Sequence, residues 1–252
     1  MKSGVPTGTG SSTTTKVIYW VTVLSACTMG ETAGDFVSFG LKFGYGWASC
    51  ILATLLVMAL VVEARAKAPN EARYWTMIVI MSTTGTALAD FLTRTLKLGY
   101  GLGSAVLITL FAAIYFIERR SRIDINTQTS TPATDVFYWA EMILVCTFGT
   151  TMGDFVSNGL NLGFAGGSLL LTGLLAIVLI PELRAKVSSK PRYWTAIVIT
   201  STIGATTGDF LTKENALNLG YGWGSAILIA VFVVIFLIGR RLKPIAVTES
   251  SR

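Results

Sequence analysis

One stretch occurs four times in the chain, first as YWVTVLSACTMGETAGDF at residues 19–36. Each copy begins with Tyr-Trp and has Thr eight residues after the Trp, Gly at ten and Asp at fifteen, followed by Phe. The four copies start at Trp20, Trp75, Trp139 and Trp194 and reach Asp35, Asp90, Asp154 and Asp209 without insertion or deletion. Self-similarity at this scale indicates duplication of a structural unit. The chain is therefore predicted to consist of four tandem repeats.

The composition is that of a membrane protein. Hydrophobic residues make up 52% and charged residues 13% of the chain, whereas soluble domains carry about 25% charged residues. Each copy continues through a Gly-Tyr-Gly-like turn into a charge-free apolar run, at residues 45–62, 100–117, 164–180 and 221–238. Such runs are about long enough to cross a hydrocarbon core of ~30 Å. With the apolar segment before each Asp, they predict an all-α integral membrane protein with eight transmembrane helices, two per repeat.

The basic residues predict the orientation in the membrane. The two chain ends and the three junctions between copies hold 16 of the 20 Lys and Arg residues. The opposite side keeps only Lys42, Arg94, Lys97 and Lys213. By the positive-inside rule, both termini and all junctions are cytoplasmic. The net charge of +6 then indicates anionic lipid at the cytoplasmic face as a partner, and not nucleic acid.

A second level of duplication divides the chain into two pseudo-symmetric halves. Copies 1 and 3 read Gly-Asp-Phe-Val-Ser, whereas copies 2 and 4 read Asp-Phe-Leu-Thr. All copies share one orientation, so the expected pseudo-axis runs along the membrane normal, unlike that of inverted-repeat transporters. The predicted units are a disordered cytoplasmic tail (1–15), a first half (16–122), a cytoplasmic linker (123–134), a second half (135–243) and a cytoplasmic tail (244–252).

A stripe of hydroxyl and carboxylate side chains is predicted on the first helix of each copy. Positions three, four and seven before the Asp fall on the Asp face of a helix. The candidate cation ligands are Glu31, Asp35, Asp90, Asp154 and Asp209, and the candidate path-lining residues are Thr28, Thr83, Thr147, Thr202, Thr86 and Thr150. Ionisable groups within a membrane span are expected to face a bundle interior or a water-filled path. The alternative is that each Asp caps a helix end at the outer interface while Thr bonds backbone.

Two further carboxylates depart from the repeat. Glu31 has no counterpart in the other copies and lies one turn from Asp35, so the pair is expected to share a proton or bind a cation. The alternative is that Glu31 simply hydrogen-bonds a Thr of another copy. Glu141 lies on a different face from Asp154 and is predicted to snorkel at the cytoplasmic interface.

Three other motifs are interpreted structurally. The Tyr-Trp pairs are predicted to anchor the inner aromatic belt. The small residues of the Gly-Tyr-Gly-like turns are predicted to let helices approach closely. Cys27 and Cys146 occupy equivalent positions and are predicted to be small buried packing residues.

The sequence offers no case for an enzyme. It contains no nucleophile–base constellation, no His and no paired Cys motif for zinc or copper(II). Resident cofactors are therefore not expected. Carboxylate and hydroxyl oxygens favour a hard ion such as manganese, magnesium or calcium.

The four in-phase copies, over residues 16–241, resemble a bacterial membrane-protein family of four tandem two-span repeats of unknown function. Members are also labelled membrane-anchored proteins predicted to regulate amylopullulanase. The resemblance implies the fold and the bacterial cytoplasmic (inner) membrane as location. The stretch from Glu31 to Asp35 is also similar to the Glu-x-Gly-Asp signature of cation exchangers that move manganese or calcium. Here one more residue separates Glu from Gly34, and the other copies lack the Glu.

The leading hypothesis is a secondary transporter or exporter of a hard divalent cation, manganese first, coupled to protons through the carboxylates. One alternative is a membrane scaffold or regulatory subunit whose Asp residues are structural. Another is a passive cation channel. Assembly of several copies of the chain into a homo-oligomer is left open.

Overall fold

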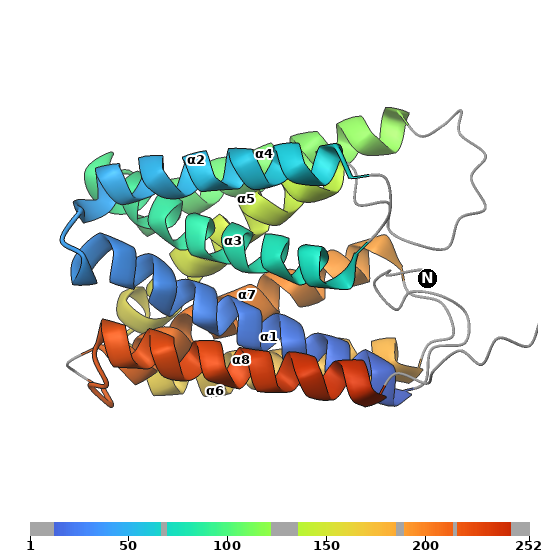
Figure 1. The fold of residues 1–252 in the computed structure, drawn as a ribbon. Helices are drawn as coiled ribbons and strands as arrows, with labels where there is room; N and C mark the ends of the chain where they lie inside the picture. Colours follow the sequence, from blue (N-terminus) through green and yellow to red (C-terminus); the bar gives the residue numbers. More distant parts are fainter. Residues whose placement is uncertain (1–12, 67–69, 122–135, 185–188, 214–215, 243–252) are drawn as a thin grey trace, which may run out of the picture.

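The described residues form an all-helical bundle (Figure 1). The structure is a computed structural model that describes residues 13–66, 70–121, 136–184, 189–213 and 216–242. The helices are α1 (Thr13–Asp35), α2 (Gly44–Ala64), α3 (Glu71–Asp90), α4 (Gly99–Ser121), α5 (Val136–Asp154), α6 (Gly163–Arg184), α7 (Lys190–Thr212) and α8 (Tyr221–Leu242), with π-helical turns η1 (Phe36–Gly40), η2 (Phe91–Thr95) and η4 (Phe155–Gly159). Two long helices per copy confirm the predicted all-α class.

One of the predicted boundaries can be compared with these helices. Helix α1 begins at Thr13, so the last three residues of the predicted tail 1–15 are helical. The remainder of that tail, the linker 123–134 and the tail 244–252 lie outside the described residues.

The four odd-numbered helices form an inner ring, and the four even-numbered helices surround it. Helix α1 packs against α3, α3 against α5, α5 against α7, and α7 closes the ring on α1. Each outer helix packs mainly on the first helix of the next copy: α2 on α3, α4 on α5, α6 on α7, and α8 on α1. The first and last copies are thus joined as the others are, and the repeats form a closed ring.

Within the described residues, six helices are long and apolar enough to cross a membrane, and they fall into an outer and an inner set. The four outer spans have mean hydropathies of 2.0 to 2.5 and are mostly exposed on the surface, while α3 and α5 have 1.3 and 1.2 and are mostly buried. Helices α1 and α7 are as long as α4, at 23 residues, but their Thr, Ser and Gly content makes them less apolar. Apolar side chains on the outer helices therefore face away from the protein.

Close approach of the inner helices depends on a layer of glycines in the middle of the repeat. A Cβ at Gly30 would lie 2.3 Å from the Ser82 hydroxyl oxygen, and one at Gly85 would lie 2.7 Å from the Cys146 Cβ. The same relation continues around the ring, from Gly149 to Ser201 and from Gly204 to Cys27. Cys27 and Cys146 are buried in this layer, which confirms their predicted packing role.

The Gly-Tyr-Gly-like turns lie together at one end of the bundle, here called the turn end (Figure 1). Their glycines serve backbone conformation, because Gly44, Gly99, Gly163 and Gly220 all have φ between 65° and 71°, a region that suits Gly. A Cβ at any of these four would have no neighbour within 4 Å. The prediction of close contact is therefore wrong for the first turn glycines, but it holds for later small residues of the same cluster. A Cβ at Gly224 would lie 2.4 Å from Thr212, and one at Gly167 would lie 3.2 Å from Ser157.

The opposite end, here called the junction end, is closed by a ring of tyrosines. The hydroxyl of Tyr19 lies 3.1 Å from that of Tyr74 and 2.9 Å from that of Tyr193. Tyr138 completes the ring, 2.9 Å from both Tyr74 and Tyr193. Each hydroxyl can donate one hydrogen bond and accept another, so four identical groups satisfy one another.

The tryptophans of the four Tyr-Trp pairs pack beside this ring. Trp20, Trp75, Trp139 and Trp194 are all buried, and each stands edge-on to the Tyr before it. The prediction of an aromatic belt at the lipid interface was wrong for these residues, because their rings pack between the inner helices. The largely exposed tryptophans are Trp47 and Trp223, near the turn end.

Candidate functional site

The four repeated Asp residues form a buried layer at the turn end of the inner ring. Asp35, Asp90, Asp154 and Asp209 are the last or nearly the last residues of α1, α3, α5 and α7 and are no more than 5% exposed. In the first three copies the backbone changes from α to π geometry directly after the Asp. Single π turns inside helices are often found at functional sites.

Arg94 forms ion pairs with two of these carboxylates. Its Nε lies 2.8 Å from Asp90 Oδ1, one turn earlier on the same helical segment, and its Nη2 lies 3.1 Å from Asp154 Oδ2 on α5. Nη1 donates to the Tyr45 hydroxyl at 3.1 Å. Copies 2 and 3 are therefore linked by a guanidinium that forms ion pairs with both carboxylates and donates a hydrogen bond to Asp154.

Lys213 occupies the equivalent position in copy 4, four residues after Asp209. Its Nζ lies 2.6 Å from Asp209 Oδ2 and 3.9 Å from Asp35 Oδ2, and it also faces the ring of Phe164. The second distance is too long for a hydrogen bond. Asp209 Oδ1 and Asp35 Oδ2 are buried and make no hydrogen bond within the described residues.

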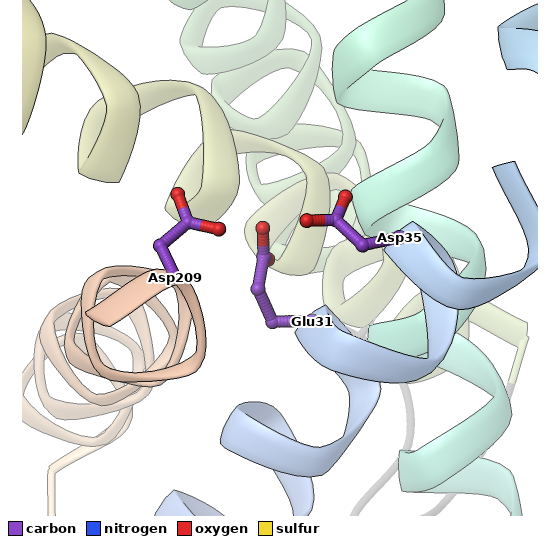
Figure 2. Close-up of side chains that lie close together, drawn as sticks. All are labelled: Glu31, Asp35 and Asp209. Atoms are coloured by element: carbon purple, nitrogen blue, oxygen red, sulfur yellow. The ribbon is translucent and has the colours of Figure 1, made fainter. Parts of the chain in front are cut away.

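Glu31 adds a third carboxylate on the Lys213 side. Figure 2 shows the carboxyl groups of Glu31, Asp35 and Asp209 converging from α1 and α7, and one oxygen of each lies within 4.8 Å of the others. Glu31 Oε2 accepts hydrogen bonds from the hydroxyls of Thr86 at 2.9 Å and Thr150 at 2.8 Å. All four inner helices therefore meet around this group, which we call the carboxylate triad (Glu31, Asp35 and Asp209).

The other candidate residues lie outside the triad. Asp90 and Asp154 are engaged by Arg94. The hydroxyls of Thr28, Thr83, Thr147 and Thr202 each donate to the carbonyl four residues earlier in their own helix, at 2.8 to 2.9 Å. These four side chains are buried, and the hydrogen bonds they make stay within one helix. Of the six candidate path-lining residues, Thr86 and Thr150 are the two that hydrogen-bond a carboxylate.

Arg94 and Lys213 were missed in the sequence as site residues. They were counted only as basic residues of the outer side. The signal that could have found them is their spacing, since each follows an Asp by four residues and therefore lies on the same helix face. Copies 1 and 3 have Phe39 and Asn158 at that position, so only two of the four copies provide a cation.

A second buried polar cluster lies at the junction end. Glu118 on α4 and Glu141 on α5 both form ion pairs with Lys190 at the start of α7, the Glu141 pair at 3.5 Å. Glu141 is completely buried. The prediction that Glu141 snorkels at the interface was wrong, because the side chain points inward and Lys190 supplies its counter-charge.

The carboxylate triad has the chemistry of a site for a hard cation. Carboxylate and hydroxyl oxygens are the ligands that Mg²⁺, Ca²⁺ and Mn²⁺ prefer. When ionised, the triad presents three negative charges to the single ammonium of Lys213, whereas Arg94 faces two. Buried carboxylates without full compensation are costly, so the triad side favours an additional cation or protons.

The described part of the chain is an all-helical set of tandem repeats, and six of its helices are long and apolar enough to cross a membrane. The chain belongs to the family described as Repeat of Unknown Function (DUF347), whose model matches residues 18–68, 73–124, 137–188 and 192–243. These four segments coincide with the four copies and confirm the resemblance seen in the sequence. No curated protein and no solved structure matches the chain.

Proposed function

We propose that all eight long helices cross the cytoplasmic membrane of a bacterium, with both termini and the junction end in the cytoplasm. The distribution of basic residues, 16 of 20 at the chain ends and junctions, supports this orientation. Helices α1 and α7 take part in the same inner ring as α3 and α5, two of the six apolar helices. Their polar side chains are enclosed by that ring and need not meet lipid. Anionic lipid is the expected partner of the basic junctions.

Within this membrane protein, the proposed activity is secondary transport of a hard divalent cation, with manganese as the first ion to test. The observation that carries the proposal is the convergence of Glu31, Asp35 and Asp209 within 4.8 Å, all buried. Intramembrane carboxylates are rare and mark ion pathways and proton relays. A pair of carboxylates one helical turn apart can exchange a cation for a proton, which provides coupling to the proton gradient.

The test is uptake of Mn²⁺ into liposomes that contain the purified protein, with Mg²⁺, Ca²⁺ and Co²⁺ as competitors. We expect uptake that depends on an imposed proton gradient and is lost in Glu31→Gln and Asp35→Asn proteins. Uptake that simply follows the Mn²⁺ gradient would indicate a passive channel. Absence of uptake of any of these ions by the wild-type protein would contradict the proposal.

A second function, that of a membrane scaffold or regulatory subunit, is supported by the engagement of the repeated Asp residues by Arg94 and Lys213. In that case the charges link copies 2 with 3 and 4 with 1. Deletion-strain growth on graded manganese separates the two functions. A scaffold predicts wild-type metal tolerance and metal content for Glu31→Gln and Asp35→Asn proteins that reach the membrane in normal amounts.

A further inference from the structure

The two cations of the turn end occupy equivalent positions with unequal surroundings. Arg94 and Lys213 both follow the Asp of their own copy by four residues, and both reach the Asp of the next copy around the ring. The repeat therefore makes the two positions equivalent, while the residues around them differ.

On the Arg94 side, one cation lies close to both carboxylates. Its guanidinium lies within 3.1 Å of both Asp90 and Asp154, and such a group is always charged and presents five fixed donors. Thr150 stands where copy 1 has Glu31, so no third carboxylate approaches from that copy. This side therefore sets one guanidinium against two carboxylates, one carboxylate fewer than faces Lys213.

On the Lys213 side, the cation does not reach all of the carboxylates. Among the described carboxylates, the ammonium is in hydrogen-bond range of Asp209 alone, at 2.6 Å, and lies 3.9 Å from Asp35. Asp209 Oδ1, from a side chain only 3% exposed, has no hydrogen-bond partner within the described residues. Glu31 brings a third carboxylate to the same place. The oxygens of the triad therefore exceed what one ammonium can engage.

The backbone also differs at the two cations. Arg94 lies inside η2, whereas α7 ends at Thr212 and Lys213 has an extended backbone, with ψ of 149°. Copy 4 is also longer here, since Gly220 follows Asp209 by eleven residues and Gly99 follows Asp90 by nine. Withdrawal of the lysine side chain from the triad would not require a helical turn to unwind.

We propose that the Lys213 ammonium is a tethered counter-ion that competes with a divalent cation for the carboxylate triad. The ion binds between Glu31, Asp35 and Asp209 as the ammonium withdraws, and the ammonium returns when the ion leaves. The carboxylates thus retain a positive partner at every stage. Arg94 does not exchange and serves as a permanent link. This inference rests on the proposed cation transport and specifies how its site is kept neutral between ions.

The first test is binding of Mn²⁺ to purified protein, measured from the electron paramagnetic resonance signal of the free ion. Lys213→Gln removes the competing charge, so Mn²⁺ should bind about tenfold more tightly or better. Release should slow, and uptake per protein should fall. Lys42→Asn is the matched control, because Lys42 is an exposed residue of the turn end and copies 3 and 4 have Asn161 and Asn218 there. Its binding should equal that of the wild type.

A second measurement uses the wild-type protein and does not depend on the folding of a variant. Lysines are labelled with an amine reagent, with and without Mn²⁺, and the extent of labelling at Lys213 is read by peptide mass spectrometry. Labelling of Lys213 should rise severalfold with Mn²⁺, while that of Lys42 should stay constant. Constant labelling of Lys213 under saturating Mn²⁺ would overturn the inference.

The outcomes separate this inference from the function on which it rests. If the wild type binds Mn²⁺ and Glu31→Gln does not, but Lys213→Gln binds no more tightly than wild type, the tethered counter-ion is wrong and the cation site stands. If the wild type binds none of Mn²⁺, Mg²⁺ and Ca²⁺, both the site and the counter-ion are wrong.

Discussion

At each end of the inner ring, four equivalent polar side chains come together, and they find their partners in different ways. At the junction end, four equivalent tyrosines hydrogen-bond one another in a closed circle. At the turn end, four equivalent aspartates meet, and two cations that only copies 2 and 4 provide stand between them. Both layers come from the same repeat, some sixteen residues apart.

The difference follows from the chemistry of the repeated group. A hydroxyl both donates and accepts, so four copies of it need nothing else. A carboxylate only accepts, and like charges repel in a buried site, so four copies require partners of another kind. Symmetry is therefore retained in the tyrosine ring and broken in the aspartate layer. The residues that break it, Glu31, Arg94 and Lys213, are those to which we assign function or linkage.

The largest effect on stability is expected at Arg94, because its single guanidinium is the counter-charge of two buried carboxylates. Arg94→Met leaves Asp90 and Asp154 buried without a counter-charge and should destabilise the protein by about 3 kcal/mol. Lys97→Asn is the control, because Lys97 is exposed and Asn stands at that position in copies 3 and 4. Thermal unfolding in detergent measures both variants. Equal midpoints for Arg94→Met and the control would show that Arg94 does not link the copies.

A somewhat smaller effect is expected in the glycine layer between the two ends. In Gly85→Ala the new Cβ would lie 2.7 Å from the Cys146 Cβ and 2.9 Å from backbone atoms of α5. Overpacking of this kind costs about 1–3 kcal/mol. Gly101→Ala provides the comparison, since a Cβ there has no neighbour within 4 Å. If both substitutions lower the unfolding midpoint equally, close packing of α3 on α5 is not what Gly85 provides.

The smallest effect is expected at the tyrosine ring. Tyr193→Phe removes the hydroxyl between Tyr19 and Tyr138 and should cost about 1 kcal/mol, because two buried hydroxyls each lose a partner. Replacing all four tyrosines by Phe should cost less than four times the single change, since no buried donor then remains unpaired. Thermal unfolding of the single and quadruple variants decides this point. Additive costs would mean that the four hydroxyls do not act as one ring.

Much of the fold could be predicted from the sequence, because the repeat sets its own boundaries. Positive-φ glycines begin the second helix of the first three copies and directly precede it in the fourth, and an Asp ends the α-helical part of the first helix in three. The order of packing could not be predicted. That each outer helix lies on the first helix of the next copy depends on side-chain fit between segments, and nothing in one repeat specifies its neighbour.

The carboxylates of the site could be predicted, whereas their partners could not. Helical spacing placed Glu31 near Asp35, but it did not show that Asp209 would join them across the ring. The predictions for Glu141 and for the Tyr-Trp pairs were wrong because these residue types are common at membrane interfaces. Tertiary packing buries these side chains in the protein interior instead. Charges on the outer side were counted for topology alone, so Arg94 and Lys213 were overlooked.

The two halves of the aspartate layer are unequal, and we propose that only the half with the carboxylate triad binds a cation. Asp35 and Asp90 are equivalent in the repeat, but Asp35 has Glu31 one turn below it where Asp90 has Thr86. The most direct measurement is Mn²⁺ uptake into liposomes by Asp35→Asn and Asp90→Asn proteins, matched for amount and folding. We predict that Asp35→Asn abolishes uptake and that Asp90→Asn weakens it less. Equal loss in both variants, or wild-type uptake by Asp35→Asn, would contradict the claim.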